Sequence, residues 1–362
     1  MRSSSTSGAQ LSETDKRNRF MNTRVLVADR DLRIADLVRR VLFNFGFRHV
    51  DMVDSGLKAL EALDQNSYEL LITEWNMTPT DGISLVKAIR QAKKAKRLRR
   101  DIPIIMLTGK AEKEDVQQAR DAGITEFLVK PFSAKTLSNR IVKVIDYPRV
   151  FVEAPVYAGP CRRRRKPLAP DGQERRTPRE QLKHAREKTA ATADITLDTG
   201  SDLLGLVAFL PPNIEIKQQI GEDVSAQDIL TETVVEQGQD AIRAAADEYV
   251  EWARDDIAKL EEAYNELVTR PTDPTAHHLL ISSAYSIKTQ AGIFGYDLGS
   301  EVGKLLVDYL TNNVLIDENR LMVIRKHIDA IAVIFNQKIK ETGREIAADL
   351  VRSLRRLISK MG

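Results

Sequence analysis

The chain has 362 residues, enough for two or three domains, and its net charge of +3 excludes a strongly basic or acidic polyelectrolyte. The single cysteine, Cys161, excludes an internal disulfide, and no apolar run approaches the roughly 20 residues that span a bilayer, so we expect a cytoplasmic protein without membrane insertion. Residues 1–21 are polar, lack a secretory signal and are predicted to be a disordered tail, which leaves Met1 or Met21 as the true start.

Residues 22–147 alternate short apolar runs with amphipathic stretches, which is typical of βα repeats. The predicted strands are Arg24–Ala28, His49–Val53, Tyr68–Thr73, Ile102–Thr108 and Glu126–Val129. The predicted helices are Leu32–Phe45, Gly56–Leu63, Ile83–Arg90, Glu112–Ala122 and Ala134–Ile145. Five such repeats predict an α/β domain in which helices cover both faces of a five-stranded parallel sheet.

Polar side chains follow or end four of these strands, namely Asp29, Glu74, Thr108 and Lys130. Because the carboxyl ends of parallel strands meet at one edge of a sheet, we expect these side chains to share the edge where ligands bind. Two acids, a hydroxyl and an amine together predict a phosphate or metal site. The peptide bond between Lys130 and Pro131 is a candidate cis bond, since cis bonds occur before proline.

The segments VLVADRD, LLITEWNMTPTDG, PIIMLTG and FLVKPF resemble the receiver domain of bacterial response regulators over about 125 residues. The resemblance implies a doubly wound, flavodoxin-like fold and phosphotransfer from a phosphohistidine to an acidic residue at the position of Glu74. It also implies that Asp29 is one of two acids that hold magnesium, with a backbone carbonyl of Asn76 as a further ligand.

The same resemblance assigns roles at the later strands. Thr108 and Lys130 match the positions that contact the phosphoryl oxygens, and Phe127 matches the aromatic residue that switches rotamer on activation. Two central positions depart from the family pattern. Arg30 stands where the second magnesium acid is expected, and Glu74 stands where the family has aspartate.

Both departures disfavour phosphotransfer. A guanidinium removes an oxygen ligand from magnesium and adds a repelling charge, while the extra methylene of Glu74 displaces its carboxylate, and an error near 1 Å costs roughly 100-fold in rate. We therefore expect weak or absent phosphorylation and no cofactor, magnesium being the one candidate. Either Arg30 pairs with Glu74 in place of magnesium, or Glu74 mimics phosphoaspartate. Both alternatives predict a constitutive docking module.

Residues 148–222 are rich in proline and arginine, a composition that predicts a basic linker, with an apolar docking strap at Leu203–Ile220. Residues 91–100 and 161–188 are strongly basic, which leaves nucleic acid open as a partner. No aromatic residues alternate with these arginines, so we do not favour that alternative.

Residues 223–362 show helical periodicity without a strand pattern, which predicts an all-α bundle of up-and-down topology. The predicted helices are Ser225–Arg270, Asp273–Gln290, Leu298–Asn312, Asn319–Ile339 and Glu341–Met361.

One helix of this predicted bundle contains the segment AYSIKTQAGIFG, which resembles the signature of histidine phosphotransfer domains. Tyr285 stands where that family has its phosphorylatable histidine, Lys288 matches the lysine three residues later, and Thr289 replaces a glycine. His278 lies two turns earlier on the same helix face and is either a displaced acceptor or a surface histidine. The resemblance implies a docking face that has lost its reacting side chain.

Three functions follow as alternatives. The first is a two-component signalling adaptor that binds a histidine kinase, a phosphotransfer protein or another response regulator without carrying phosphate. The second is a working response regulator phosphorylated at Glu74 or Asp29, and the third is a nucleic-acid-binding regulator. The sequence shows no nucleophile–base pair or metal cluster, so we expect no enzymatic activity. The identity of the partners and the oligomeric state are left open.

Overall fold

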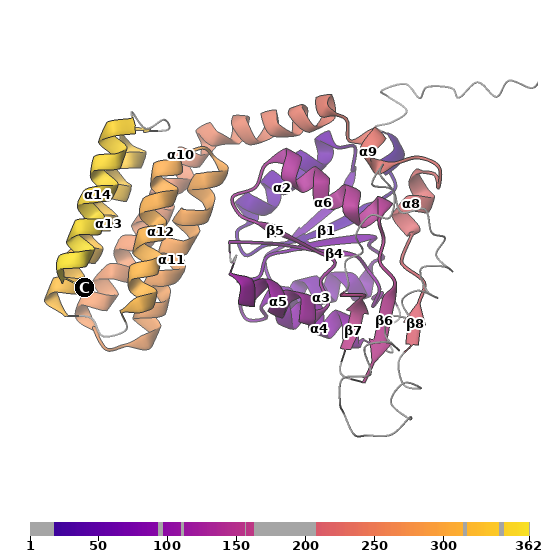
Figure 1. Cartoon of the computed structure of the whole chain (residues 1–362), viewed down its shortest axis with the longest axis horizontal. Helices are drawn as coiled ribbons and strands as arrows, with labels where there is room; N and C mark the ends of the chain where they lie inside the picture. Colours follow the sequence, from indigo (N-terminus) through magenta and orange to yellow (C-terminus); the bar gives the residue numbers. More distant parts are fainter. Residues whose placement is uncertain are drawn as a thin grey trace, which may run out of the picture. The chain divides into compact units, whose positions relative to one another are not determined.

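The chain forms two compact units in the computed structural model (Figure 1). The first unit comprises residues 1–128 and 134–239, and the second comprises residues 129–133 and 240–362. The residues that the structure describes are 18–92, 97–109, 112–155, 157–162, 208–313, 317–339 and 344–361.

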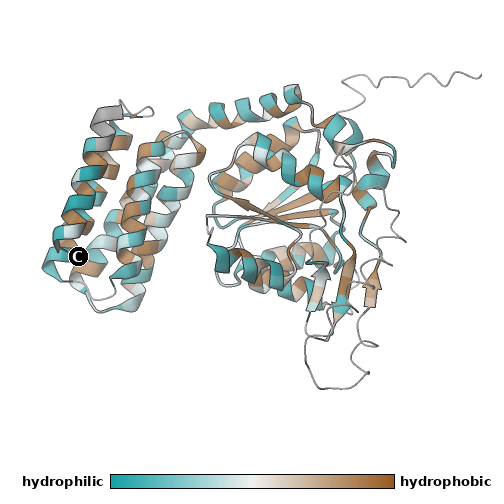
Figure 2. Cartoon of the chain, viewed as in Figure 1, coloured by the Kyte–Doolittle hydropathy of each residue, from teal (hydrophilic) through white to brown (hydrophobic). Residues whose placement is uncertain are grey.

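A five-stranded parallel sheet forms the centre of the first unit. Its strands are β1 (Arg24–Ala28), β2 (His49–Val53), β3 (Leu70–Thr73), β4 (Ile104–Thr108) and β5 (Glu126–Val129). They lie in the order β2-β1-β3-β4-β5, which is the doubly wound, flavodoxin-like order expected from the sequence. Strands β3 and β4 are buried along their whole length, which explains why they have continuous apolar runs instead of an alternating pattern (Figure 2).

Helices cover both faces of this sheet, with α2 and α6 on one face and α3, α4 and α5 on the other (Figure 1). Their bounds are Leu32–Asn44 for α2, Gly56–Gln65 for α3, Gly82–Gln91 for α4, Lys113–Ala122 for α5 and Ala134–Asp146 for α6. Side chains cap several of them at the N-terminus. Asp81, for example, accepts the backbone N–H of Ser84 at 2.6 Å and satisfies a donor of α4 that would otherwise lack a helical partner.

Both ends of the predicted linker form secondary structure. Strands β6 (Phe151–Ala154), β7 (Tyr157–Pro160) and β8 (Ala208–Leu210) form an antiparallel sheet in the order β7-β6-β8, and α8 spans Glu215–Ile220. Within the predicted docking strap, Leu203–Ile220, the side chains of Ile216 and Ile220 are buried. Residues 163–207 lie outside the described residues.

Arg90, at the end of α4, joins this small sheet to the larger one. Its guanidinium is almost fully buried and donates to the carbonyl oxygens of Gly123 at 2.9 Å and Ile102 at 2.8 Å. It also lies over the ring of Phe151 in β6, 5.8 Å from the centroid. Burial lowers the pKa of Arg90 to about 10. A β-carbon on Gly123 would lie 2.9 Å from the carbonyl oxygen of Ala158, so β7 approaches this turn closely.

The end of the predicted N-terminal tail belongs to the folded first unit. Asn18–Phe20 form a 3₁₀ turn, and the buried ring of Phe20 stacks on Phe47 with centroids 4.4 Å apart. Arg19 donates to the carbonyl oxygen of Ile220 at 3.0 Å, which ties the turn to α8. The boundary predicted at residue 21 therefore lies inside folded structure, while residues 1–17 lie outside the described residues.

The predicted helices of the C-terminal part are present. They are α9 (Ala226–Ile229), α10 (Glu232–Thr269), α11 (Pro274–Ile293), α12 (Asp297–Asn312), α13 (Glu318–Asn336) and α14 (Arg344–Met361). Helix α10 begins in the first unit, where a β-carbon on Gly238 would lie 2.8 Å from the ring of Phe45, and continues into the second. The sequence placed the boundary between the two parts before residue 223, whereas the structure divides them between residues 239 and 240.

An aromatic cluster fills the core of the helical unit. The ring of Tyr249 stacks on Phe294 at 4.4 Å and meets Phe335 edge-on at 5.6 Å, while Tyr296 contacts both Tyr249 and Phe335. Consecutive helices from α11 to α14 pack against one another, as expected for an up-and-down bundle. Within the described ranges, no helix is long and apolar enough to cross a membrane.

Candidate functional site

The carboxyl edge of the parallel sheet brings together the strand-end residues that the sequence singled out. Ala28 of β1 is in register with Thr73 of β3, so Asp29 and Glu74 both lie immediately beyond a paired position. The N–H of Glu74 donates to the carbonyl oxygen of Ala28 at 2.8 Å, which continues the ladder to the site. Thr108 ends the neighbouring strand β4, and all three side chains are buried.

Two predicted positions follow from strand β5. Lys130 comes directly after it, is buried, and precedes Pro131 through a cis peptide bond, which confirms that prediction. Phe127, the predicted switch aromatic, is buried in the same apolar core as Trp75 and Met77.

The carboxylate of Glu74 turns back onto its own loop. Its Oε1 accepts the backbone N–H of Trp75 at 2.6 Å and that of Asn76 at 3.2 Å. The loop is compact, because the N–H of Gly82 donates to the carbonyl oxygen of Trp75 at 2.7 Å. Glycine is required at position 82, since a β-carbon there would lie 2.2 Å from the carbonyl oxygen of Glu74. One oxygen of the predicted phosphoacceptor is therefore bound to backbone amides.

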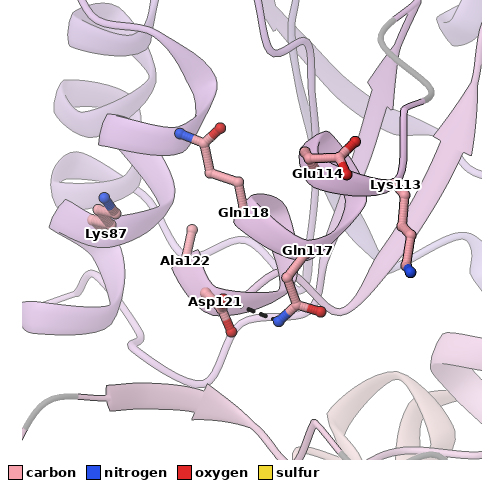
Figure 3. A pocket seen from close by; sticks show the side chains of 7 residues that line it. All are labelled: Lys87, Lys113, Glu114, Gln117, Gln118, Asp121 and Ala122. Carbon is pink, nitrogen blue, oxygen red and sulfur yellow. Dashed lines mark hydrogen bonds between the residues drawn. The ribbon is translucent and has the colours of Figure 1, made fainter.

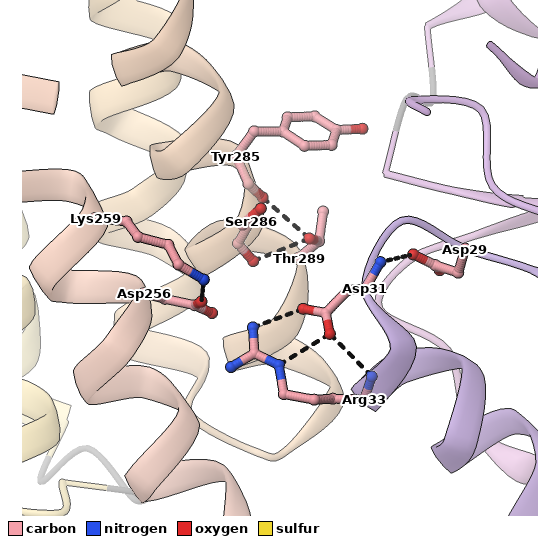
Figure 4. Close-up of polar contacts among 8 residues, drawn as sticks. All are labelled: Asp29, Asp31, Arg33, Asp256, Lys259, Tyr285, Ser286 and Thr289. Carbon is pink, nitrogen blue, oxygen red and sulfur yellow. Dashed lines mark hydrogen bonds and ion pairs between the residues drawn. The ribbon is translucent and has the colours of Figure 1, made fainter. Parts of the chain in front are cut away.

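Asp31 is a second acid near β1, and its role did not follow from residue type or spacing. Its N–H donates to Oδ1 of Asp29 at 3.0 Å, and its carboxylate caps α2 by accepting the N–H of Arg33 at 3.0 Å (Figure 4). The guanidinium of Arg33 also binds both carboxylate oxygens, through Nε at 2.9 Å and Nη2 at 2.7 Å. The feature of the sequence that indicates this contact is an aspartate at the start of a helix, followed two residues later by an arginine.

Arg30 is half-buried beside this acid. The ion pair between Arg30 and Glu74 that the sequence suggested stays a prediction. With Asp31 clamped by Arg33 and Oε1 of Glu74 bound to backbone amides, the residues here fit magnesium poorly, because this ion needs near-octahedral oxygen ligands. Within the described ranges, no group of three or more His, Cys, Asp or Glu side chains is arranged to hold a metal ion.

The predicted basic surfaces have internal partners where the structure describes them. Arg99 pairs with Glu215 of α8, and Arg100 pairs with Glu153 of β6 at 3.2 Å. Arg162 pairs with Asp121 of α5. These contacts give part of the basic character a structural role, which weakens the case for nucleic acid. Residues 93–96 and 163–188 lie outside the described residues.

In the helical unit, Tyr285 and Lys288 lie on α11 as predicted, with the Lys288 ammonium 5.3 Å from the centroid of the Tyr285 ring. Thr289 is buried, and its hydroxyl donates to the carbonyl oxygens of Tyr285 at 3.0 Å and Ser286 at 3.1 Å (Figure 4). His278 is exposed on the same helix.

Helix α12 approaches α11 closely beside these residues. A β-carbon on Gly303 would lie 3.0 Å from the backbone nitrogen of Lys288, and Ser300 donates to the carbonyl oxygen of Lys288 at 2.7 Å.

Sequence reasoning also missed His327, which is completely buried in α13. Its Nδ1 lies 2.8 Å from the carbonyl oxygen of Val323, its ring stacks on Tyr309, and burial lowers its pKa. Its position on the apolar face of α13 is the feature of the sequence that could have predicted its burial.

A separate open hollow of about 710 Å³ lies between α4 and α5 in the first unit (Figure 3). Polar and charged residues make up most of its lining, which comprises Lys87, Lys113, Glu114, Gln117, Gln118, Asp121 and Ala122. It includes none of the strand-end residues.

Comparisons with known proteins match the first unit. A family model of the response regulator receiver domain matches residues 25–142. Chemotaxis protein CheY-3 of Vibrio cholerae is 33% identical over 125 residues, which covers 34% of this chain and 93% of that protein. Chemotaxis protein CheY of Pseudomonas aeruginosa is 30% identical over 123 residues, with 34% and 96% covered.

Two solved structures are similar to about a third of this chain. Chemotaxis protein CheY4 of Vibrio cholerae is 29% identical, with 34% of this chain and 98% of that chain covered and a TM-score of 0.31. The receiver domain of a sensor histidine kinase from Pseudomonas aeruginosa, solved with a magnesium ion in its active-site cleft, is 26% identical, with 33% and 94% covered and a TM-score of 0.30.

Proposed function

Since this chain belongs to the response regulator receiver family through residues 25–142, we propose that it is a two-component signalling adaptor. It binds phosphorelay partners through a receiver that does not carry a phosphoryl group. The partners are proteins that recognise receivers, namely histidine kinases, phosphotransfer proteins or other response regulators. The function is recognition, without an enzymatic step.

The observation that carries this proposal is the position of the Glu74 carboxylate. A nucleophilic carboxylate must present an oxygen to the incoming phosphorus atom in line with the leaving group. Oε1 of Glu74 instead accepts two backbone N–H groups of its own loop. Turning it outward would break two charge-assisted hydrogen bonds, each contributing roughly 1.5–3 kcal/mol, and leave both donors without this acceptor. The side chain is thus better suited to holding the loop than to attacking phosphorus.

Charge compensation at the strand ends supports the same proposal. A receiver that uses magnesium needs carboxylates whose negative charge is available to the cation. Here Asp31 is bound on both oxygens by Arg33 of its own helix, and Arg30, which carries a second guanidinium, follows Asp29 in the chain. Arginine is always charged at physiological pH. We infer that these two arginines supply positive charge that magnesium provides in the working family members.

The helical unit supports docking without transfer. Tyr285 replaces the imidazole that the resemblance expects, and the ammonium of Lys288 lies over its ring. A phosphotyrosine ester is too stable to pass its phosphoryl group to a carboxylate at a useful rate. Lys288 and the later glycines of the segment, Gly292 and Gly295, remain, so we propose that α11 presents a recognition surface for a receiver.

The test is phosphorylation of the full chain by acetyl phosphate with magnesium, and by a phosphohistidine donor, followed by intact mass and peptide mapping. We expect no stable adduct of one phosphoryl group, while pull-downs still recover a histidine kinase or phosphotransfer protein. The matched control is a working receiver treated in parallel. A stable adduct on Glu74 or Asp29 would overturn the proposal.

That outcome would favour the second candidate, a phosphorylatable response regulator. The observation in its favour is that Asp29, Thr108 and Lys130 are retained and buried at the strand ends.

A further inference from the structure

The last helix of the chain, α14, presents a basic stripe to solvent. Val351 and Leu354 are buried on its other side, where α14 packs against α12 and α13. Its exposed basic side chains are those of Arg352, Arg355, Arg356 and Lys360. Spacings of three and four residues keep them on one side of the helix, over about 12 Å. Within the described residues Arg356 and Lys360 have no ion-pair partner, so their charge is available to a second molecule.

Helix α10 presents the opposite charge to solvent. Exposed acids follow one another in the second unit at spacings of four, seven and four residues, and they are Glu251, Asp255, Glu262 and Glu266. These spacings place them in one acidic stripe, about 22 Å long. Glu251 pairs with Arg254 of the same helix, whereas the other three acids have no ion-pair partner within the described part of the chain.

The basic stripe of α14 and the acidic stripe of α10 lie at the same level of the helical unit. Arg355 pairs with Glu301 of α12 at 3.2 Å. One turn away on α12, a β-carbon on Gly299 would lie 3.1 Å from the ring of Phe335 in α13. The ring of Phe335 in turn meets Tyr249 of α10, with centroids 5.6 Å apart. Arg355 is therefore level with Tyr249, and the acidic stripe begins two residues after Tyr249.

Helix α13 packs against both charged helices and has an exposed face of its own. Met322 and Val333 are 46% and 48% exposed, and their spacing of eleven residues puts them on one side of α13. Lys326 and Asp329 share this side and pair with each other at 3.8 Å, so the face carries little net charge. Two large apolar side chains on a nearly neutral face are suited to contact with another protein surface.

We propose that two copies of this chain form a dimer in which the acidic stripe of α10 in each copy lies against the basic stripe of α14 in the other. A two-fold axis parallel to α13 makes both contacts at once, because it exchanges the two sides of α13 and preserves the level along the helix. An axis across α13 would place acids against acids. A second copy fits better than an unrelated acidic protein, because the same unit carries the complement of the basic stripe at the matching level.

The inference goes beyond the proposed function and does not rest on it. The dimer has two receivers and two copies of α11, so one assembly can hold two partners.

The experiment measures the mass of the full chain by sedimentation velocity in roughly 0.1 M and 1 M sodium chloride, where the Debye length falls from about 10 Å to about 3 Å. At the lower salt concentration we expect a dimer with a dissociation constant on the order of 10 µM, because its contacts are exposed ion pairs of modest strength. The affinity should fall by a factor of about ten or more at the higher salt concentration, since salt screens such pairs.

Two charge-reversed chains test which helices meet. Arg352→Glu with Arg356→Glu makes the stripe of α14 acidic, and Glu251→Lys with Asp255→Lys makes the stripe of α10 basic. Each reversed chain should bind itself more weakly than the parent by a factor of about ten or more, since like charges then face each other at both contacts. An equimolar mixture of the two chains should regain the parent affinity to within about threefold, because every contact again joins opposite charges.

The two reversals are matched in their effect on folding. Each breaks one exposed ion pair within its own helix, that of Arg352 with Asp349 or that of Glu251 with Arg254, and such pairs contribute little to stability. The thermal midpoint of each chain checks this.

The control for net charge is Lys58→Glu with Lys87→Glu. Both lysines are exposed on helices of the first unit, and the two changes alter net charge by the same amount as the α14 reversal. This chain should dimerise with the affinity of the parent.

A parent chain that is monomeric at about 100 µM in the lower salt concentration overturns the inference. Parent-like affinity in both reversed chains also overturns it, as does a mixture that stays monomeric, which would show that α10 and α14 do not meet. Should a reversed chain not fold, Arg356→Gln and Asp255→Gln remove one charge each and should weaken the dimer about threefold. A phosphoryl adduct on Glu74 would overturn the proposed function and leave this inference unaffected.

Discussion

The receiver's strand ends and helix α11 each hold a substituted phosphorelay position, and the two substitutions differ in what surrounds them. Glu74 keeps the negative charge of the residue it replaces, and backbone amides bind that charge. Tyr285 keeps neither the charge nor the nucleophile of an imidazole, and a lysine covers its ring. At position 74 the acid is kept and only its length differs from the family pattern, whereas at position 285 the reacting group itself has been replaced.

The largest effect should come from repairing the receiver. Glu74→Asp with Arg30→Asp shortens the acceptor by one methylene and replaces a cation with an oxygen ligand for magnesium. Because an error near 1 Å in placement costs roughly 100-fold, we expect labelling by acetyl phosphate to rise by about 100-fold over the parent chain. Intact mass and the acid stability of the adduct report the result.

The same repair in the bundle should fail, which sharpens the comparison. Tyr285→His restores an imidazole, but Thr289 adds a side chain where the resemblance expects glycine. We expect labelling of this variant to stay at least tenfold below that of the receiver double variant. Equal labelling of Tyr285→His and the receiver double variant would contradict this expectation. It would show that each unit lost only its reacting residue.

An intermediate effect should come from releasing the acid that Arg33 clamps. Arg33→Ala removes a positive charge that is bound to both carboxylate oxygens of Asp31. Loss of one repelling charge a few ångströms from a partly buried cation changes the binding free energy by at least about 1.4 kcal/mol. We therefore expect Mn²⁺ to bind at the strand ends roughly tenfold more tightly in this variant. Quenching of Trp75 emission by Mn²⁺ in a Trp252→Phe chain measures this affinity. Arg39→Ala is the control, because it removes the same charge from the same helix at a pair with Asp36. Equal Mn²⁺ affinities of Arg33→Ala and Arg39→Ala would show that the ion pair between Arg33 and Asp31 does not oppose cation binding.

Most of the receiver was predictable from sequence, and particular residues show why the rest was not. Strands β1, β2 and β5 have the predicted bounds, because short apolar runs that alternate with amphipathic helices are typical of a parallel sheet. Strands β6 to β8 have three or four residues each, and β8 pairs with β6 across more than 50 residues of chain, so local pattern carries no signal for them. Arginine at the end of a helix predicts a surface residue, yet Arg90 is buried by a sheet that the sequence did not reveal.

For the candidate site, the sequence predicted which residues lie at the strand ends but not which contacts their side chains make. Strand ends located Asp29, Glu74 and Thr108, since the carboxyl edge of a parallel sheet is set by topology. The direction of the Glu74 carboxylate depends on loop geometry that Gly82 permits, and the Asp31 clamp depends on the rotamer of Arg33. Neither follows from residue type or spacing.

The smallest effect concerns His327, a buried histidine whose ring nitrogen Nδ1 lies beside a backbone carbonyl oxygen, in contrast to Glu74, whose carboxylate is held by backbone amides. Burial lowers the pKa of His327 below the ordinary value of 6.5 for histidine, so the unfolded chain takes up the proton first as pH falls. The stability of the helical unit is therefore complete above about pH 6.5 and decreases below it. We expect a loss on the order of 1 kcal/mol between pH 6.5 and 5.5, measured by urea unfolding with Trp252 emission in a Trp75→Phe chain. His327→Phe should flatten this dependence, whereas His278→Gln, at an exposed histidine of the same unit, should leave it unchanged. A parent-like pH slope in His327→Phe would assign the dependence to other groups of the helical unit.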